Sequence, residues 1–262
     1  MNVGGNELVV ESDHELARLA AVAAGRALMT LREEIGFDDP KRLRDEGDRT
    51  AHVLLMQLLA EQRPGDAVLS EEGLDGKERL GARRVWIVDP LDGTREFGEE
   101  GRTDWAVHVA LIEDGVPVAA AVALPARDMV MTTFPAEIRP DQAPGGRLRL
   151  VVSRSHTPPE AVAVAQELDA DLVYMGSAGA KTMAVVLGDA DAYVHVGGQY
   201  EWDSAAPVGV ALAAGLRATR IDGSPLRYNR ENPWLPDQII CRPDLHEAIV
   251  NAVRSAVAAP QT

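Results

Sequence analysis

The 262-residue sequence is poor in residues on which many protein classes depend. It contains one cysteine, Cys241, so it can form no internal disulfide and no cysteine metal cluster. It lacks a run of about 18 apolar residues, which a membrane-spanning helix needs, because its longest stretch without a charge is 204–216. Its first residues do not form a signal-peptide pattern. We therefore expect a soluble, cytoplasmic protein without a membrane span.

Positive charge is also scarce. The sequence has 26 Lys and Arg against 41 Asp and Glu, which gives a formal net charge of −15. Without a Lys/Arg-rich stripe, such a chain lacks the attraction that drives binding to nucleic-acid phosphates or anionic lipid. The hydrophobic content of 46% is ample for a buried core. We expect one large domain or two closely packed ones, and no nucleic-acid polymer as a partner.

The N-terminal half reads as helices followed by an antiparallel sheet. Ser-Asp-His-Glu15 is typical of a capping box and precedes a long amphipathic helix, and Asp48 is expected to open a second one. Asp114-Gly115 favours a tight hairpin. Strands are predicted at 67–70, 84–89, 105–113, 116–124 and 129–134.

Beyond a Pro/Gly-rich break at 140–146, predicted strands and helices alternate. The strands are expected at 148–152, 171–174, 190–196 and 238–241, and the helices at 158–168, 178–187, 204–214 and after Pro243. Asp222-Gly223 predicts a further hairpin. The simplest organisation has an N-terminal half, residues 1–140, and a C-terminal half, residues 147–262, packed as an α+β fold.

Acidic residues gather where predicted elements begin or end. Most of the 41 acids are ordinary solvated charge, but one group stands on backbone made rigid by a proline, a glycine or a helix start, where sites are usually built. This group comprises Asp48, Glu71, Glu72, Asp89, Asp92 and Asp203. If these side chains converge, their mutual repulsion must be offset by bound cations, since two like charges ~4 Å apart cost about 4 kcal/mol at an effective dielectric of ~20.

The type of donor indicates the type of metal. Oxygen ligands without His or Cys favour Mg²⁺ or Mn²⁺ over zinc or copper. The turn Asp89-Pro-Leu-Asp92 can present two carboxylates and the Leu91 carbonyl, and Gly93-Thr94 is expected to start a helix whose N–H groups face the same place. Carboxylates that hold cations, beside amides that hold an anion, predict a phosphate ester bound through metal ions.

Two segments, Asp89-Pro-Leu-Asp-Gly-Thr94 and Trp202-Asp-Ser-Ala-Ala-Pro207, resemble the paired signature of the inositol monophosphatase superfamily of Mg²⁺-dependent, lithium-sensitive phosphatases. Within it, Val68-Leu-Ser-Glu-Glu72, Arg95-Glu-Phe97 and Ser153-Arg-Ser-His156 resemble the CysQ group. The resemblance implies a layered α/β sandwich in an αβαβα arrangement. It also implies hydrolysis of the 3′-phosphate of 3′-phosphoadenosine 5′-phosphate (PAP) to AMP, with the phosphosulfate PAPS as a related substrate, in sulfur assimilation.

The resemblance further implies a role for each site residue. The metal ligands would be Glu71, Asp89, the Leu91 carbonyl, Asp92 and Asp203, with Asp48 at a third, weaker site. Two or three Mg²⁺ ions are therefore the expected cofactors, with Mn²⁺ as a substitute and Li⁺ as an inhibitor. Thr94, paired with Asp48 and supported by Glu71, would orient and deprotonate the attacking water, without a covalent phosphoenzyme.

Substrate contacts are also implied by the resemblance. The residues concerned are Leu91, Asp92, Gly93, Thr94, Arg154, His156, Ser177, Lys181 and Asp203. Two departures keep alternatives open: Gly176-Ser-Ala-Gly-Ala-Lys181 is one residue longer than the Gly-Ser-x-x-Lys segment of PAP phosphatases, and Tyr193-Val-His195 lacks the arginine of their Tyr-Pro-Arg. The first alternative is an inositol-1-monophosphatase or fructose-1,6-bisphosphatase with the same site. The second is a non-catalytic metal- or nucleotide-binding module. The sequence leaves the oligomeric state open, a homodimer included.

Overall fold

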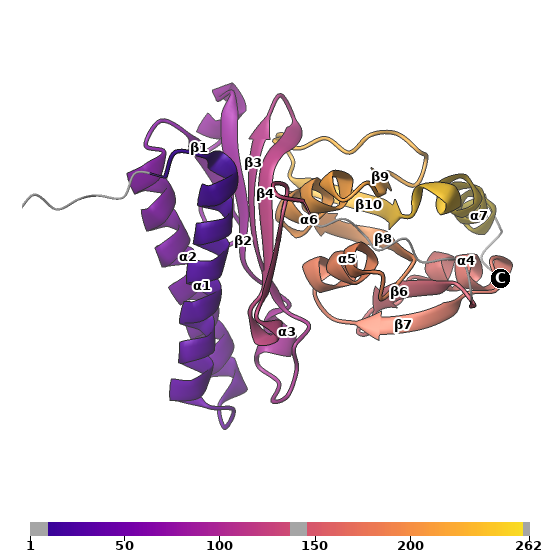
Figure 1. Cartoon of the computed structure of the whole chain (residues 1–262), viewed down its shortest axis with the longest axis horizontal. Helices are drawn as coiled ribbons and strands as arrows, with labels where there is room; N and C mark the ends of the chain where they lie inside the picture. Colours follow the sequence, from indigo (N-terminus) through magenta and orange to yellow (C-terminus); the bar gives the residue numbers. More distant parts are fainter. Residues whose placement is uncertain (1–9, 137–145, 259–262) are drawn as a thin grey trace, which may run out of the picture.

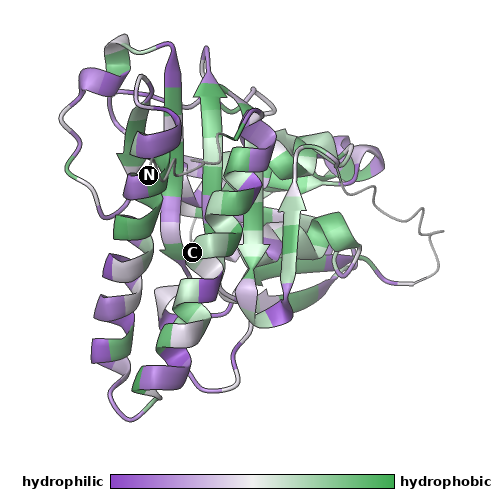
Figure 2. Ribbon diagram, turned by 60° about the vertical axis from the view of Figure 1, so that its left-hand side comes forward, coloured by the Kyte–Doolittle hydropathy of each residue, from purple (hydrophilic) through white to green (hydrophobic). Residues whose placement is uncertain are grey.

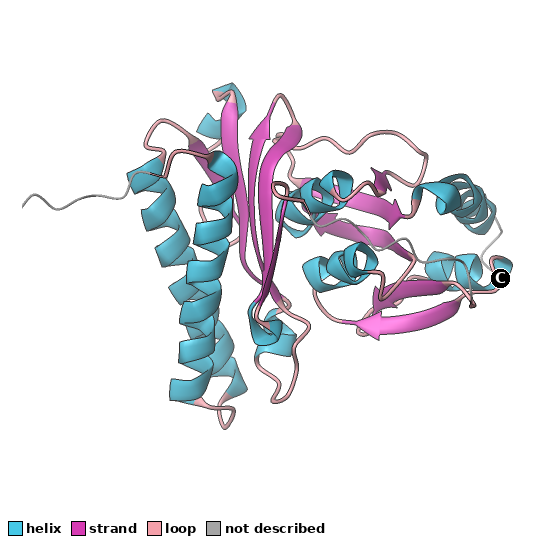
Figure 3. Cartoon of the chain, in the orientation of Figure 1, coloured by secondary structure: helices cyan, strands magenta, loops and turns pink. Residues whose placement is uncertain are grey.

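Helices and sheets alternate in five layers in the computed structural model, which describes residues 10–136 and 146–258 (Figures 1 and 3). Helices α1 and α2 cover one face of a first sheet, α5 and α6 lie between the two sheets, and α4 and α7 cover the outer face of the second sheet. The predicted α+β sandwich with its αβαβα arrangement is confirmed. The α-helices are α1 (Asp13–Ile35), α2 (Pro40–Gln62), α3 (Thr94–Phe97), α4 (Pro159–Glu167), α5 (Ala178–Leu187), α6 (Glu201–Ala213) and α7 (His246–Ala258).

The first sheet has the strand order β1-β2-β3-β4-β5, and all its pairs are antiparallel except β1 with β2. Its strands are β1 (Ala67–Ser70), β2 (Arg84–Asp92), β3 (Ala106–Glu113), β4 (Val116–Leu124) and β5 (Met129–Thr132). The predicted hairpin at Asp114-Gly115 is present, and both residues have the positive φ that a type I′ turn requires. Strand β2 runs past its predicted end at Asp89, because a register shift between Asp89 and Asp92 accommodates Pro90 without breaking the pairing with β3.

The second sheet has the order β7-β6-β8-β10-β9. Its strands are β6 (Arg149–Ser153), β7 (Asp171–Met175), β8 (Ala192–Tyr200), β9 (Arg217–Thr219) and β10 (Trp234–Cys241), and short 3₁₀ turns lie at η1 (Glu78–Gly81), η2 (Pro125–Arg127) and η3 (Pro243–Leu245). The predicted hairpin at Asp222-Gly223 is wrong: a turn is present there, but β9 and β10 are joined by the long segment 220–233. The predicted break at 140–146 lies almost wholly outside the described residues.

The first two helices differ from prediction, one in its cap and the other in its start. Helix α1 begins after Ser12 as expected, but the Ser12 side chain makes no capping hydrogen bond. Helix α2 begins at Pro40 rather than at Asp48, because Asp39 caps it by accepting a hydrogen bond from the N–H of Arg42 and a proline suits the first helical position. The charged residues after Pro40 occupy the outer side of an amphipathic helix, as the purple and green alternation along the N-terminal helices shows (Figure 2). Asp48 therefore lies inside α2.

The layers bring the ends of several elements together. Helices α5 and α6 are buried along most of their length between the sheets, which explains their almost continuous apolar sequence. Strand β8 continues to Tyr200, so α6 begins three residues before its predicted start and Asp203 lies in its first turn. The end of β2 consequently faces the first turns of α5 and α6, at the boundary between the halves. None of the helices in the described residues combines the length and the apolar character needed to cross a bilayer.

Candidate active site

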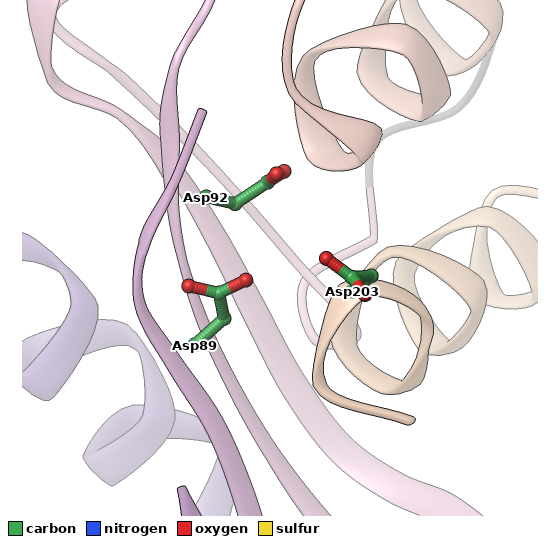
Figure 4. Close-up of side chains that lie close together, drawn as sticks. All are labelled: Asp89, Asp92 and Asp203. Carbon is green, nitrogen blue, oxygen red and sulfur yellow. The ribbon is translucent and has the colours of Figure 1, made fainter. Parts of the chain in front are cut away.

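Three carboxylates meet at the end of β2. One oxygen each of Asp89, Asp92 and Asp203 lies within 4.8 Å of the other two. Asp89 and Asp92 extend from the end of β2, and Asp203 faces them from the first turn of α6 (Figure 4). Asp89 and Asp92 are buried, so their charges are removed from water. The structure thus brings together three of the metal ligands implied by the sequence, from segments more than a hundred residues apart.

The turn after Asp89 orients the groups around it. The Leu91 N–H donates to the Asp89 carboxylate at 3.0 Å, and the Leu91 carbonyl accepts a 3.0 Å hydrogen bond from the Thr94 hydroxyl. The same hydroxyl lies 3.5 Å from Asp48, the partner predicted for it. Gly93 has a φ of 86° and packs against Ser177, where a Cβ would lie 3.0 Å from the Ser177 Cβ, so the turn requires glycine on both counts.

Four of the acids have pKa values raised above their usual range. Burial raises the pKa of Asp48 to about 7, and the charge of Glu72 adds to the effect. Burial, followed by the charge of Asp203, raises the pKa of Glu71 to about 7. Burial and the charge of Asp92 raise that of Asp203 to about 6, and burial and Glu71 raise that of Asp89 well above the usual value. The charge of Asp203 acts on both Glu71 and Asp89, so these three carboxylates resist ionisation beside one another, as expected of oxygen donors suited to divalent cations.

Asp92 differs from the other acids because donors surround it. Its Oδ2 accepts hydrogen bonds from the Ser177 hydroxyl at 2.5 Å and the Gly179 N–H at 2.6 Å, and its Oδ1 accepts one from the Ala178 N–H at 3.1 Å. Burial opposes ionisation of this carboxyl, but His108 and the Ser177 hydroxyl outweigh it and hold the pKa of Asp92 below its usual range. Asp92 is therefore anchored as an anion at the start of α5.

Lys181 is held beneath the loop that precedes α5. Its side chain is 5% exposed, and its ammonium group donates to the carbonyls of Gly176 at 2.9 Å and Ser177 at 2.8 Å. It also lies 5.3 Å from the centre of the Tyr193 ring. Burial lowers the pKa of Lys181. The structure thus gives Lys181 a bonding role within the protein, and the substrate contact implied by the sequence stays a prediction.

Arg154 and His156 lie outside the carboxylate cluster. Arg154 forms ion pairs with Glu96 at 2.6 Å and Glu99 at 2.7 Å, which connect the segment after β6 to the region of α3. His156 donates its backbone N–H to the Ser153 hydroxyl at 3.3 Å, and its ring lies beside Gly197. Their contacts with substrate also stay predictions.

His108 is not among the site residues predicted from the sequence. This side chain is fully buried on β3, with Nε2 3.1 Å from the Asp92 Oδ2 and Nδ1 3.0 Å from the Trp202 carbonyl. Burial opposes its protonation, but the charge of Asp92 outweighs this and raises the pKa of His108. An available signal was its place at the centre of an otherwise apolar strand, where an imidazole needs polar partners.

The chain belongs to the inositol monophosphatase family, whose sequence profile it matches over residues 9–258. Within the family, it is 52% identical over 260 residues to a protein of Mycobacterium leprae named 3′-phosphoadenosine 5′-phosphate phosphatase, with 93% of this chain and 94% of the relative covered. It is 32% identical over 199 residues to the 3′(2′),5′-bisphosphate nucleotidase CysQ of Escherichia coli K12, with 72% of this chain and 80% of the relative covered.

Solved structures agree with this assignment. The crystal structure of CysQ from Bacteroides thetaiotaomicron superposes with a TM-score of 0.77 at 28% identity, covering 88% of this chain and 97% of the other. Inositol monophosphatase II from Staphylococcus aureus superposes with a TM-score of 0.79 at 22% identity, over 95% and 98% of the two chains, and shows the shared fold. The resemblance to the family and to its CysQ group, stated from the sequence, is confirmed.

Proposed function

We propose that this chain is a Mg²⁺-dependent phosphatase that hydrolyses the 3′-phosphate of PAP to AMP, and that of PAPS to adenosine 5′-phosphosulfate, in cytoplasmic sulfur assimilation. The cluster of Asp89, Asp92 and Asp203 carries the proposal. Asp89 and Asp203, with raised pKa values, are poised to exchange a proton for a cation, and Asp92 already faces them as an anion. The names of the relatives at 52% and 32% identity support the choice of substrate.

The proposed metal ligands would hold two ions, with Asp89 shared between them. Glu71, Asp89 and the Leu91 carbonyl would hold one ion, and Asp89, Asp92 and Asp203 a second. Asp48, inside α2, would contribute to a third. Divalent cations in such a site neutralise phosphoryl oxygens and lower the pKa of water. Because the family resemblance implies sensitivity to lithium, we expect Li⁺ to inhibit, and activity that is indifferent to Li⁺ would count against this mechanism.

The residues beside the cluster can handle the proton of the attacking water. The Thr94 hydroxyl donates its one hydrogen bond to the Leu91 carbonyl at 3.0 Å or to Asp48 at 3.5 Å, so its oxygen is free to accept a hydrogen bond from water. A carboxyl group with a pKa of about 7, such as Asp48, is suited to accept a proton near neutral pH. The proposed path therefore runs from water to Thr94 and from Thr94 to Asp48, while the Gly93 and Thr94 amides hold the phosphate.

A substrate panel tests the proposal. Initial rates are compared on PAP, PAPS, inositol 1-phosphate and fructose 1,6-bisphosphate at one low concentration with Mg²⁺, and we expect PAP to be hydrolysed fastest. Faster turnover of inositol 1-phosphate or fructose 1,6-bisphosphate would replace the proposed substrate while keeping the site. A protein that binds Mg²⁺ and turns over none of the four would instead be the non-catalytic binding module.

A further inference from the structure

His108 lies between the two elements that carry the clustered carboxylates, strand β2 and helix α6. It is paired in register with Asp89 on the neighbouring strand β2, and it is completely buried. Along β3, side chains alternate between the α1/α2 side and the α5/α6 side, and the neighbours of His108 on the latter side are Ala106 and Ala110. Two small side chains therefore leave room for the imidazole between the sheet and the central helices.

Each ring nitrogen of His108 faces a different part of the site. The Nδ1 atom lies 3.0 Å from the carbonyl of Trp202, the residue before Asp203, and Nε2 lies 3.1 Å from the Asp92 Oδ2. A carbonyl oxygen only accepts hydrogen bonds, so Nδ1 carries a proton and donates. One ring thus spans from the end of β2 to the first turn of α6.

The first turn of α5 packs against the imidazole ring of His108 from a third side. A Cβ on Gly179 would lie 2.1 Å from the His108 Nε2 and 3.1 Å from the Ala106 Cβ, so only glycine lets α5 approach this closely. The Gly179 N–H donates to the same Asp92 oxygen that His108 faces. Contacts from β2, α5 and α6 therefore fix the orientation of the imidazole.

We propose that His108 is a positioning residue that sets the separation of Asp92 and Asp203 by contacting Asp92 with Nε2 and the backbone before Asp203 with Nδ1. The inference rests on the proposed function, because the geometry that His108 maintains is that of the proposed cation site. Groups that orient metal ligands typically change metal affinity 10- to 100-fold when they are removed. His108 touches neither substrate nor the reacting atoms in this role.

Three substitutions separate the two contacts. In His108→Asn, the side-chain amide nitrogen can take the place of Nδ1 and keep the Trp202 contact. In His108→Gln, the amide nitrogen can take the place of Nε2 and keep the Asp92 contact. His108→Leu keeps neither contact. The affinity for Mn²⁺ is measured by calorimetry without substrate, together with the melting temperature. We expect roughly 10- to 100-fold weaker binding for His108→Leu, and smaller losses for the Asn and Gln variants.

Val109→Ala is the matched control. Val109 is the next residue on β3 and is equally buried, but it faces the α1/α2 core, away from the carboxylates. The Val109→Ala variant should have a lower melting temperature but an Mn²⁺ affinity within about twofold of the wild type, because truncating a core side chain costs stability without touching the site. If His108 had only a structural role, its variants would likewise lose melting temperature but keep their Mn²⁺ affinity.

The outcomes distinguish this inference from the proposed function. Wild-type protein that binds Mn²⁺, with unchanged affinity in the Asn, Gln and Leu variants, overturns the role of His108 alone. Wild-type protein that binds no divalent cation overturns the proposed function, and the inference with it. If His108→Leu does not fold, the Asn and Gln variants decide, since each keeps one polar contact: weaker binding in either supports the inference, and unchanged binding in both overturns it.

Discussion

The hydroxyl of Ser177 donates a 2.5 Å hydrogen bond to the carboxylate of Asp92, and so connects the start of α5 to the end of β2. The same hydroxyl accepts the Ala180 N–H at 2.9 Å and caps α5, while the Ser177 backbone has a φ of 38°, a region that side-chain-bearing residues rarely occupy. The position of Asp92, a candidate metal ligand on β2, therefore depends on a cap residue of α5 with a rarely adopted backbone conformation.

Asp92→Asn is expected to abolish most phosphate release without unfolding the protein. The amide has nearly the volume of the carboxylate but carries no charge, so it is a poor ligand for a divalent cation. We expect a loss of ~100-fold or more in the rate of PAP hydrolysis, with an unchanged circular dichroism spectrum. The exposed Asp222→Asn serves as the control and should retain full activity. An active Asp92→Asn variant would contradict the two-cation site.

In the absence of divalent cations, stability is expected to fall as the pH rises from about 5 to about 8. The pKa of Glu71 is about 7 in the folded protein against an ordinary 4.5, and that of Asp203 is about 6 against 3.8. Between these values the folded state binds more protons than the unfolded chain, so its stability is lost as the pH rises through the folded pKa values.

Melting temperatures in a chelator, measured across this pH range, check the expectation. Glu71→Gln should flatten the decline by several degrees, because the amide does not titrate. Adding Mg²⁺ should raise the melting temperature most at the alkaline end, where the carboxylates are free of protons. Identical slopes for the wild type and Glu71→Gln would show that the Glu71 carboxyl titrates as an ordinary surface acid.

Lys181→Met is expected to lower the free energy of unfolding by about 2 kcal/mol. Methionine matches the length of the side chain but leaves the carbonyls of Gly176 and Ser177 without their donor in a buried loop. Urea unfolding measures the loss. The exposed Lys41→Met, which removes only an ion pair with Asp45, should change stability by less than about 0.5 kcal/mol. Equal effects would mean that the buried bonds of Lys181 contribute little.

Steady-state kinetics of the same variant address the substrate contact implied by the sequence. If Lys181 acts only through the loop, KM for PAP and KM for inositol 1-phosphate should change together. A rise in KM confined to PAP would support a direct contact with the nucleotide.

The three clustered carboxylates could be predicted because each lies beside a recognisable local sequence pattern. Asp89 and Asp92 flank a proline turn, and Asp203 precedes a run of small apolar residues, so these acids could be placed near a strand end and a helix start without knowledge of the packing. The boundaries themselves lie three residues from their predicted positions. The start of α2 at Pro40 is not evident from the sequence because residues 41–49 are mostly charged. Within this segment, only the buried residues Leu43 and Gly47 show the four-residue spacing of a helix face.

The contacts between distant segments could not be predicted in the same way. His108 faces Asp92 because a register in the first sheet and the docking of α5 coincide, and neither leaves a local pattern. Arg154 pairs with Glu96 and Glu99, two partners that its sequence context did not indicate, and its contact with substrate stays a prediction. Side-chain direction depends on such packing, so residue type and position alone do not determine which partner a charge meets.

Gly179→Ala sets two physical effects against each other. Gly179 lies in the first turn of α5, where alanine is intrinsically preferred by roughly 0.5–1 kcal/mol, so propensity alone predicts stabilisation. A Cβ at this position would lie 2.1 Å from the His108 Nε2, and a fully buried ring between a strand and a helix has little space to move. We therefore expect a net loss of about 1–3 kcal/mol in the free energy of unfolding, and weaker Mn²⁺ binding as α5 and Asp92 are displaced. Gly65→Ala, where no heavy atom lies within 4 Å of the added carbon, should be close to neutral. A more stable Gly179→Ala variant with unchanged Mn²⁺ affinity would mean that α5 and His108 can separate without disturbing the carboxylates.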